Sequence, residues 1–239
     1  MSLQVFPDAQ ALAQGAALAL AGLIETAQNA RGMCRIALSG GSTPRRLHHA
    51  LATAPLAGRI DWTRCAFYFG DERVVPLSDE RSNARMAQET LFQPLGIPTA
   101  QIFPMVLDPT QPEAEAQRYE ALLQRFDGVF DIVLLGMGSD GHCASLFPDT
   151  PALLETHRRV VANLAPQLDP PRLTLTYPAL EAAREVAVLV SGPDKAATLA
   201  QVMTGDSRLP LGRLAARRPL HWWLDAEAGH LIATPTTET

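Results

Sequence analysis

The sequence predicts an α/β fold, with a mostly parallel open sheet and helices on both of its faces, in a modified Rossmann-like arrangement. Strand-like apolar runs alternate with helical stretches along the chain, and this alternation is typical of βαβ units. Several runs are almost continuously apolar, as expected for strands covered on both faces. The sequence contains no internal repeat or convincing linker, so we expect residues 1–239 to form a single domain.

The elements are expected in this order. Strands are predicted near residues 34–40, 65–72, 130–138, 173–177, 185–192 and 219–225. Helices are predicted over residues 8–30, 44–53, 80–91, 112–126, 178–184 and 194–204. Asp8 is a suitable N-cap for the first helix, and Pro44, Pro112 and Pro193 lie at or near first turns, where proline is tolerated.

Composition excludes several classes of partner. The chain has 47% hydrophobic and 19% charged residues and a net charge of −5, so it has no basic excess for nucleic acid or an anionic membrane. The N-terminus lacks a basic signal region, and its apolar run is too interrupted to span a bilayer. Cys34, Cys65 and Cys143 are widely spaced and suggest reduced thiols. We expect a soluble cytoplasmic protein with a small-molecule partner.

Polar residues collect where the predicted strands end. The strings ALSGGSTP, FGDERVVP, GMGSDGH and VSGPDK each follow a strand. Parallel strands bring their carboxyl ends to one edge of the sheet, where open sheets of this kind bind ligands. We therefore expect a site at this edge.

The first of these loops suits an anion. Gly40 and Gly41 leave a strand, and Ser42 and Thr43 precede a helix, so free backbone N–H groups and two hydroxyls lie together. The loop matches neither a P-loop nor the GxGxxG fingerprint. The alternative is a tight turn with a Ser/Thr cap.

The second loop carries Asp71, Glu72 and Arg73. Adjacent residues of an extended chain point to opposite faces, so the two acids cannot both face a site unless the strand has already ended. The alternative is a solvated acidic turn paired with arginine.

The third loop, GMGSDGHCASLFP, follows a buried strand. Gly136 and Gly138 allow the backbone to approach a ligand closely, and Gly141 permits a positive φ between Asp140 and His142. No other histidine of the chain has such surroundings. Because functional residues often lie on loops of this kind, His142 is a candidate catalytic residue.

The last loop places Lys195 in the first turn of a helix. The helix dipole disfavours a cation there, which a bound anion would explain. The alternative is a lysine that extends to solvent.

Five strings in this order resemble the 6-phosphogluconolactonase family: LSGGSTP, GDERVVPLSDERSN, GMGSDGHCASLFP, PPRLTLTYPAL and VSGPDKAATL. The resemblance covers nearly the whole chain. It implies a fold related to glucosamine-6-phosphate isomerase. It also implies hydrolysis of 6-phosphoglucono-δ-lactone to 6-phosphogluconate in the oxidative pentose phosphate pathway, without a metal or cofactor. Cys143 departs from the threonine that typically follows the site histidine.

The resemblance and the chemistry of a lactone suggest a role for each residue. A lactone is an activated ester, so its hydrolysis needs a positioned water, a base and stabilisation of the oxyanion. This substrate also needs a binding site for its phosphate. His142 is the expected base, oriented by Asp71 or Asp140. Backbone N–H groups of the glycine loops, which include Gly138, are the candidate oxyanion donors.

The substrate phosphate is expected among Ser42, Thr43, Arg172 and Lys195. Arg73 is expected to join this polar network, or to pair with an acid and hold its loop.

Two other functions compete with this reading. In glucosamine-6-phosphate deaminases the residues around the histidine resemble GHIAFNEP, which contains a glutamate. This chain reads GHCASLFP at that place, with no acid before Asp149. A non-catalytic sugar-phosphate sensor in a transcription regulator needs a DNA-binding domain, and here the first predicted helix begins the chain.

Overall fold

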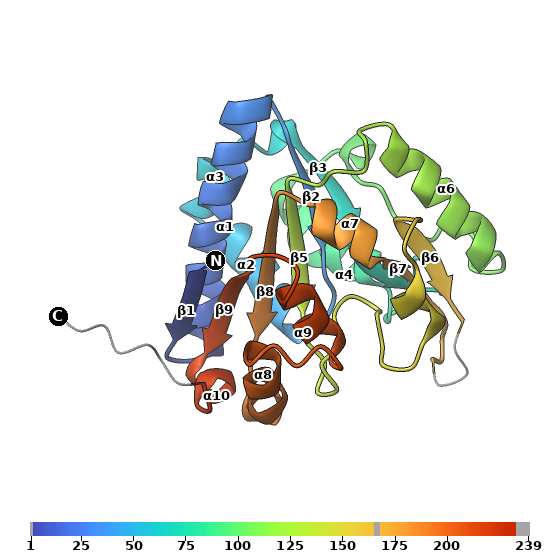
Figure 1. The fold of residues 1–239 in the computed structure, drawn as a ribbon. Helices are drawn as coiled ribbons and strands as arrows, with labels where there is room; N and C mark the ends of the chain where they lie inside the picture. The colour runs from blue at the N-terminus through green and yellow to red at the C-terminus, as the bar shows by residue number, and fades with distance from the viewer. Residues whose placement is uncertain (1, 165–167, 233–239) are drawn as a thin grey trace.

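The computed structural model describes residues 2–164 and 168–232, and within them two sheets (Figure 1). The main sheet has six parallel strands in the order β1-β9-β8-β5-β2-β3. They are β1 (Ser2–Phe6), β2 (Cys34–Leu38), β3 (Cys65–Phe69), β5 (Ile132–Gly136), β8 (Glu185–Val190) and β9 (His221–Asp225). The small antiparallel sheet has the order β4-β7-β6, formed by β4 (Asp71–Arg73), β7 (Arg172–Leu175) and β6 (Val160–Asn163).

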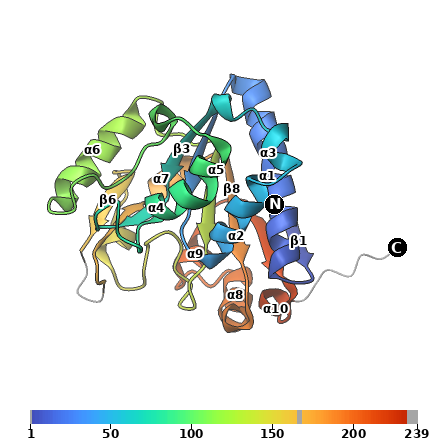
Figure 2. The same ribbon diagram turned by 180° about the vertical axis from the view of Figure 1, so that it is seen from behind.

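Helices cover both faces of the main sheet, as predicted. One face carries α1 (Ala9–Arg31), α2 (Ser42–Leu51), α3 (Leu56–Arg59), α4 (Asn83–Ala87) and α5 (Gln93–Leu95), in front in Figure 2. The other side carries α7 (Tyr177–Ala182), α8 (Ala196–Met203) and α9 (Pro210–Ala215). The remaining helices are α6 (Pro112–Gln124), which packs on the small sheet, and α10 (Ala226–Gly229).

Short turns of other helical types connect these elements. They are η1 (Trp62–Arg64), η3 (Thr99–Gln101), η4 (Pro151–Leu154) and η5 (Pro193–Lys195), which are 3₁₀ helices, and the π-helical turn η2 (Gln88–Phe92) between α4 and α5. The helices of the described ranges are all too short or too polar to span a bilayer.

The sequence explains the most regular elements directly. Every residue of β5 from Ile132 to Leu135 is almost completely buried, because helices cover both faces of the sheet, and the strand is therefore continuously apolar. Asp8 caps α1 by accepting hydrogen bonds from Gln10 N and Ala11 N. Gly32 ends the helix with φ +79°, a conformation that glycine adopts without strain.

The prediction of one strand over residues 65–72 is wrong. β3 ends at Phe69, Gly70 N donates to Leu38 O, and Asp71 begins β4 of the small sheet. The chain therefore leaves the main sheet at Gly70, and β4 pairs antiparallel with β7. The prediction also omitted β1, which precedes the first helix, and the short elements β6, α9 and α10.

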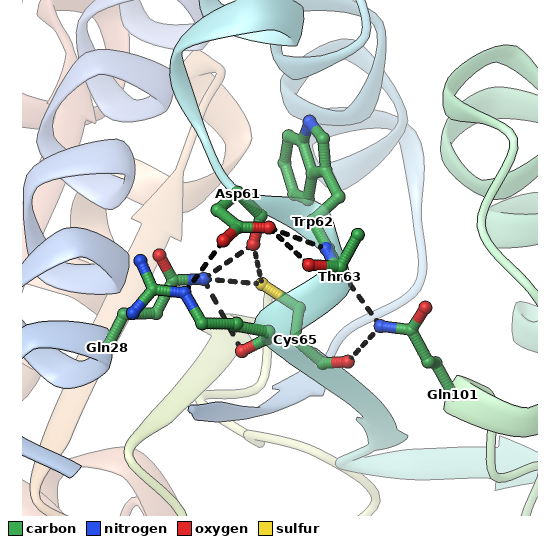
Figure 3. A network of polar contacts seen from close by, with 7 residues as sticks. Gln28, Asp61, Trp62, Thr63, Cys65 and Gln101 are labelled. Atoms are coloured by element: carbon green, nitrogen blue, oxygen red, sulfur yellow. Dashed lines mark hydrogen bonds and ion pairs between the residues drawn. The ribbon is translucent and has the colours of Figure 1, made fainter. Parts of the chain in front are cut away.

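A polar network fixes the amino end of β3, at the edge of the sheet opposite the glycine loops (Figure 3). Gln28 Nε2, on α1, donates to Asp61 O at 2.7 Å and lies 3.3 Å from Cys65 Sγ. Gln101 Nε2 donates to Trp62 O at 2.8 Å and also to Cys65 O. These contacts give partly buried backbone carbonyls their hydrogen-bond partners, so the network stabilises the fold.

The strand order defines a switch point between β2 and β5. From β2 the chain continues outward to β3 on one side, and from β5 it continues to β8 and β9 on the other. Crevices for ligands form at the carboxyl ends of strands where the order reverses in this way. The loops after Leu38 and Gly136 both leave the sheet at this point.

Candidate active site

The loop after β5 folds tightly around its glycines. Gly138 N donates to His142 O at 3.0 Å, and Gly141 N donates to Gly138 O at 3.1 Å. Gly141 has φ +76°, which supports the predicted positive φ. A Cβ at Gly138 would lie 2.1 Å from His142 Nδ1, so the imidazole can occupy its place only because residue 138 has no side chain.

Asp140 is the hydrogen-bond partner of the His142 ring. His142 Nδ1 lies 2.6 Å from Asp140 Oδ1, and His142 N donates to the same oxygen at 3.2 Å. Partial burial alone would raise the pKa of Asp140, but the hydrogen bonds and charge of His142 outweigh this effect and lower it. An ionised carboxylate only accepts, so Nδ1 carries a proton and Nε2 is left as an acceptor in the neutral ring.

Asp71 lies in the same cavity but has different partners. Its Oδ2 accepts a hydrogen bond from Ser145 Oγ at 2.6 Å, and its Oδ1 lies 3.4 Å from Asn83 Nδ2. Across the described ranges, Asp71 forms no hydrogen bond with His142. Of the two acids that the sequence left open, Asp140 is the one that holds the ring in this structure.

A cavity of about 200 Å³ opens between the loops after β2 and β5. It contains the predicted residues Gly40, Gly41, Asp71, Arg73, Gly138 and His142, together with Ser39, Asn83, Gly136, Met137 and Ala144. Polar groups from distant parts of the chain therefore meet at the switch point.

A second cavity, of about 350 Å³, adjoins the first and shares Gly41, Arg73 and Asn83 with it. Its lining includes the guanidinium-bearing residues Arg45, Arg73, Arg81 and Arg172, and also Ser42. Glu80 and Asp169 are the acids on its rim. We call this space the arginine cavity. It offers an anion several charged donors at once.

Two of these arginines lie opposite each other. Arg73 on β4 and Arg172 on β7 are paired in register, an arrangement of like charges that is destabilising by itself. Burial lowers the pKa of Arg172, and the charge of Arg73 acts in the same direction. An anion between them would relieve this repulsion.

Comparison with known proteins identifies the family of this chain. The family model "Glucosamine-6-phosphate isomerases/6-phosphogluconolactonase" matches residues 7–223. The chain belongs to this family. It is 37% identical to a 6-phosphogluconolactonase of Mycobacterium bovis, over 95% of this chain and 96% of that protein. A Synechocystis 6-phosphogluconolactonase is 38% identical with the same coverage. The solved structure of the Trypanosoma brucei 6-phosphogluconolactonase is 29% identical, with a TM-score of 0.83 over 97% of this chain and 98% of that one.

Not every predicted residue lies in these two cavities. Within the described ranges, neither lining includes Asp140, Thr43 or Lys195. Lys195 ends the turn η5 instead of lying inside α8, and its Nζ is 3.0 Å from Asp194 Oδ2. The first turn of α8, which follows Lys195, still lies close to the loop that carries His142, since Thr198 Oγ1 donates to Ser139 O at 2.6 Å.

Cys143, the residue that stands where threonine typically follows the site histidine, does not line the cavity. Cys143 is completely buried in the hydrophobic core, and burial raises the pKa of its thiol to about 12. The side chain therefore packs as a small apolar group and offers no reactive thiolate to the site.

Sequence reasoning missed several residues that complete the site. Asn83 and Ser145 lay inside quoted strings, and only the fold shows that both contact Asp71. Arg45 and Arg81 also line the arginine cavity. No group of three or more potential metal ligands occurs among the described residues.

Proposed function

We propose that this protein hydrolyses 6-phosphoglucono-δ-lactone to 6-phosphogluconate, the reaction of the oxidative pentose phosphate pathway. The observation that carries the proposal is His142, which Asp140 holds at 2.6 Å and which lines a cavity that adjoins the arginine cavity. A base and a phosphate site are the two parts that this substrate requires. The relatives named 6-phosphogluconolactonase support the same reaction.

His142 is proposed as the general base, acting through its Nε2. It removes a proton from a water whose oxygen attacks the lactone carbonyl carbon, and the carbonyl electrons move to the oxyanion. When the ester C–O bond breaks, the proton on His142 passes to the ring oxygen, which becomes a hydroxyl. Asp140 keeps the proton on Nδ1 and stabilises the imidazolium that forms in between.

Backbone N–H groups are proposed to stabilise the oxyanion. Gly138 N already donates to His142 O, so among the predicted glycines Gly40 and Gly41 are better placed for this role. Asp71 is proposed to position substrate hydroxyls or the water, because Ser145 fixes its carboxylate at the cavity wall.

The phosphate is proposed to bind in the arginine cavity. Ser42 at the start of α2, Arg73 and Arg172 are the predicted residues that line it, and charge-assisted hydrogen bonds to phosphate are strong. Thr43 and Lys195 remain proposed contacts at its margin.

We also propose that residues 1–239 form one domain, that the protein is cytoplasmic, and that it binds neither nucleic acid nor membrane. The pairing of β1 with β9 joins the two ends of the chain in one sheet, which supports a single domain. The net charge of −5 argues against polyanionic partners.

The test is lactone hydrolysis measured above the spontaneous rate, with His142→Ala as the variant. We expect kcat to fall by roughly 10²- to 10⁴-fold. His49→Ala is the matched control, because His49 is exposed and lies outside both cavities. A wild-type protein that does not exceed background would overturn the function. Ammonia release from glucosamine 6-phosphate would then identify the deaminase alternative.

A further inference from the structure

Asn83 lies where the two cavities join, and its side chain is almost completely buried. Its Nδ2 donates to Asp71 O at 2.9 Å and lies 3.4 Å from Asp71 Oδ1. Its Oδ1 accepts a hydrogen bond from Arg73 Nη1 at 2.6 Å. Arginine can only donate, so the orientation of this amide is determined by its neighbours. One side chain therefore contacts a proposed catalytic acid and a proposed substrate-binding arginine.

The backbone at Asn83 is itself held from β4. Glu72 points away from the cavity and accepts hydrogen bonds from Asn83 N and Ala84 N, both at 2.8 Å. Ser82 Oγ donates to the same carboxylate at 3.0 Å. The neighbours Asp71 and Glu72 thus have separate tasks. Asp71 faces the cavity, whereas Glu72 fastens the start of α4 beside it.

Gly40 leaves the space that the Asn83 amide needs. A Cβ at position 40 would lie 1.9 Å from Asn83 Oδ1, and its nearest neighbours are all atoms of that amide. The glycine loop after β2 and the side chain of Asn83 therefore fit together as a pair.

We propose that Asn83 is a positioning residue for the reaction. It holds Asp71 and Arg73 in fixed relative positions at the junction of the two cavities. This inference rests on the proposed function. The amide donates to the acid through Nδ2 and accepts from the arginine through Oδ1, so it couples the reacting end of the substrate site to the arginine cavity.

Two substitutions at Asn83 separate the two contacts. Asn83→Ala removes both, and we expect kcat to fall and KM for the phosphorylated lactone to rise, each by about tenfold or more, as for lost hydrogen bonds to charged groups. Asn83→Asp keeps an oxygen for Arg73 but puts a carboxylate beside Asp71. We expect it to lower kcat to a similar extent while KM stays within about threefold of the wild-type value.

A double substitution tests the fit with Gly40. Gly40→Ala alone should displace the Asn83 amide and lower kcat/KM. In the Asn83→Ala background the clashing amide is gone, so the combined loss should be clearly smaller than the product of the two single losses. The same cycle measured by urea unfolding should show the same coupling in stability.

Gln28→Ala is the matched control, because Gln28 is an equally buried amide that lines neither cavity and lies at the amino end of β3. It should reduce stability and leave KM at the wild-type value. An active wild type whose Asn83→Ala variant keeps wild-type kcat and KM would overturn this inference alone. A double variant whose loss in kcat/KM equals the product of the losses for Gly40→Ala and Asn83→Ala would also overturn it. A wild type without lactonase activity would overturn the proposed function and this inference with it.

Discussion

The orientation of the His142 ring depends on three neighbours in its own loop. Asp140 contacts Nδ1 at 2.6 Å, and Gly138 lacks the Cβ that would collide with the same nitrogen. The ring also lies on Phe147, with centroids 4.2 Å apart. Three local contacts therefore hold the proposed base before any substrate binds, which is the preorganisation that proton transfer requires.

The first prediction concerns Asp140. Asp140→Asn keeps the shape of the side chain but replaces the ionised acceptor with an amide, so the histidine is no longer held in the tautomer that leaves Nε2 free to accept. We expect kcat to fall on the order of 10²- to 10⁴-fold while the fold is retained. The measurement is steady-state lactone hydrolysis, together with a thermal melt.

Asp149→Asn is the control for this substitution. Asp149 is exposed on the same loop with φ 60°, a conformation that asparagine also accepts. Equal rates for Asp140→Asn and the wild type would show that the acid does not assist the histidine.

At the scale of elements, β4 and α4 are joined by Glu72. Its carboxylate accepts from Arg73 N, Asn83 N and Ala84 N at 2.8 Å each, and from Ser82 Oγ at 3.0 Å. α4 is only five residues long, so this cap matters more to it than helix propensity does. A buried acid thereby holds one wall of the cavity.

The second prediction is that Glu72→Gln destabilises the protein by about 1–3 kcal/mol. The amide nitrogen of glutamine would face backbone N–H groups that need an acceptor. Urea unfolding of the variant should show a lower midpoint. Glu80→Gln is the comparison, since Glu80 is exposed in the same segment. A midpoint equal to the wild-type value would contradict a structural role for this carboxylate.

For the molecule as a whole, His48 links stability to pH. It is completely buried on α2, with Nδ1 3.0 Å from Thr90 Oγ1. The Thr90 hydroxyl donates to Met86 O, so His48 Nδ1 is the donor, and Nε2 has no partner among the described residues. Burial lowers the pKa of His48 to about 3, and the charges of His49 and Arg45 act in the same direction.

The third prediction follows from the sign of this shift. The pKa is lower in the folded state than in the unfolded state, so as pH falls below about 6.5 the unfolded chain takes up the proton first. Stability is fully present above that pH and is lost progressively toward pH 3. Between pH 6.5 and pH 5 we expect His48 to account for a loss of about 2 kcal/mol.

Urea unfolding at several pH values checks this dependence. His48→Leu should flatten the decrease, whereas His49→Leu, one residue away and exposed, should retain it. A His48→Leu variant with the wild-type dependence on pH would show that another group causes the loss.

The layered fold, and the edge of the sheet at which the site lies, could be predicted from the amino-acid sequence. Continuous apolar runs such as β5 report burial on both faces, and parallel strands bring their ends to one edge whatever the packing details. The glycines around His142 and the N-cap Asp8 of α1 are local features, so short strings were enough to predict them. Residues of the site within one loop were predictable for the same reason.

Which distant groups meet in the site could not be predicted without the three-dimensional fold. Gly70 moves the chain from one sheet to another, and that change gives Asp71 and Glu72 opposite tasks. Asn83 reaches Asp71 and Arg73 because Glu72 holds the start of α4, and Arg172 comes to lie opposite Arg73 because β4 pairs with β7. No local pattern encodes either arrangement. Such contacts join residues far apart in the chain, and their geometry is set by how the sheets and helices pack, which the order of residues in any one segment does not specify.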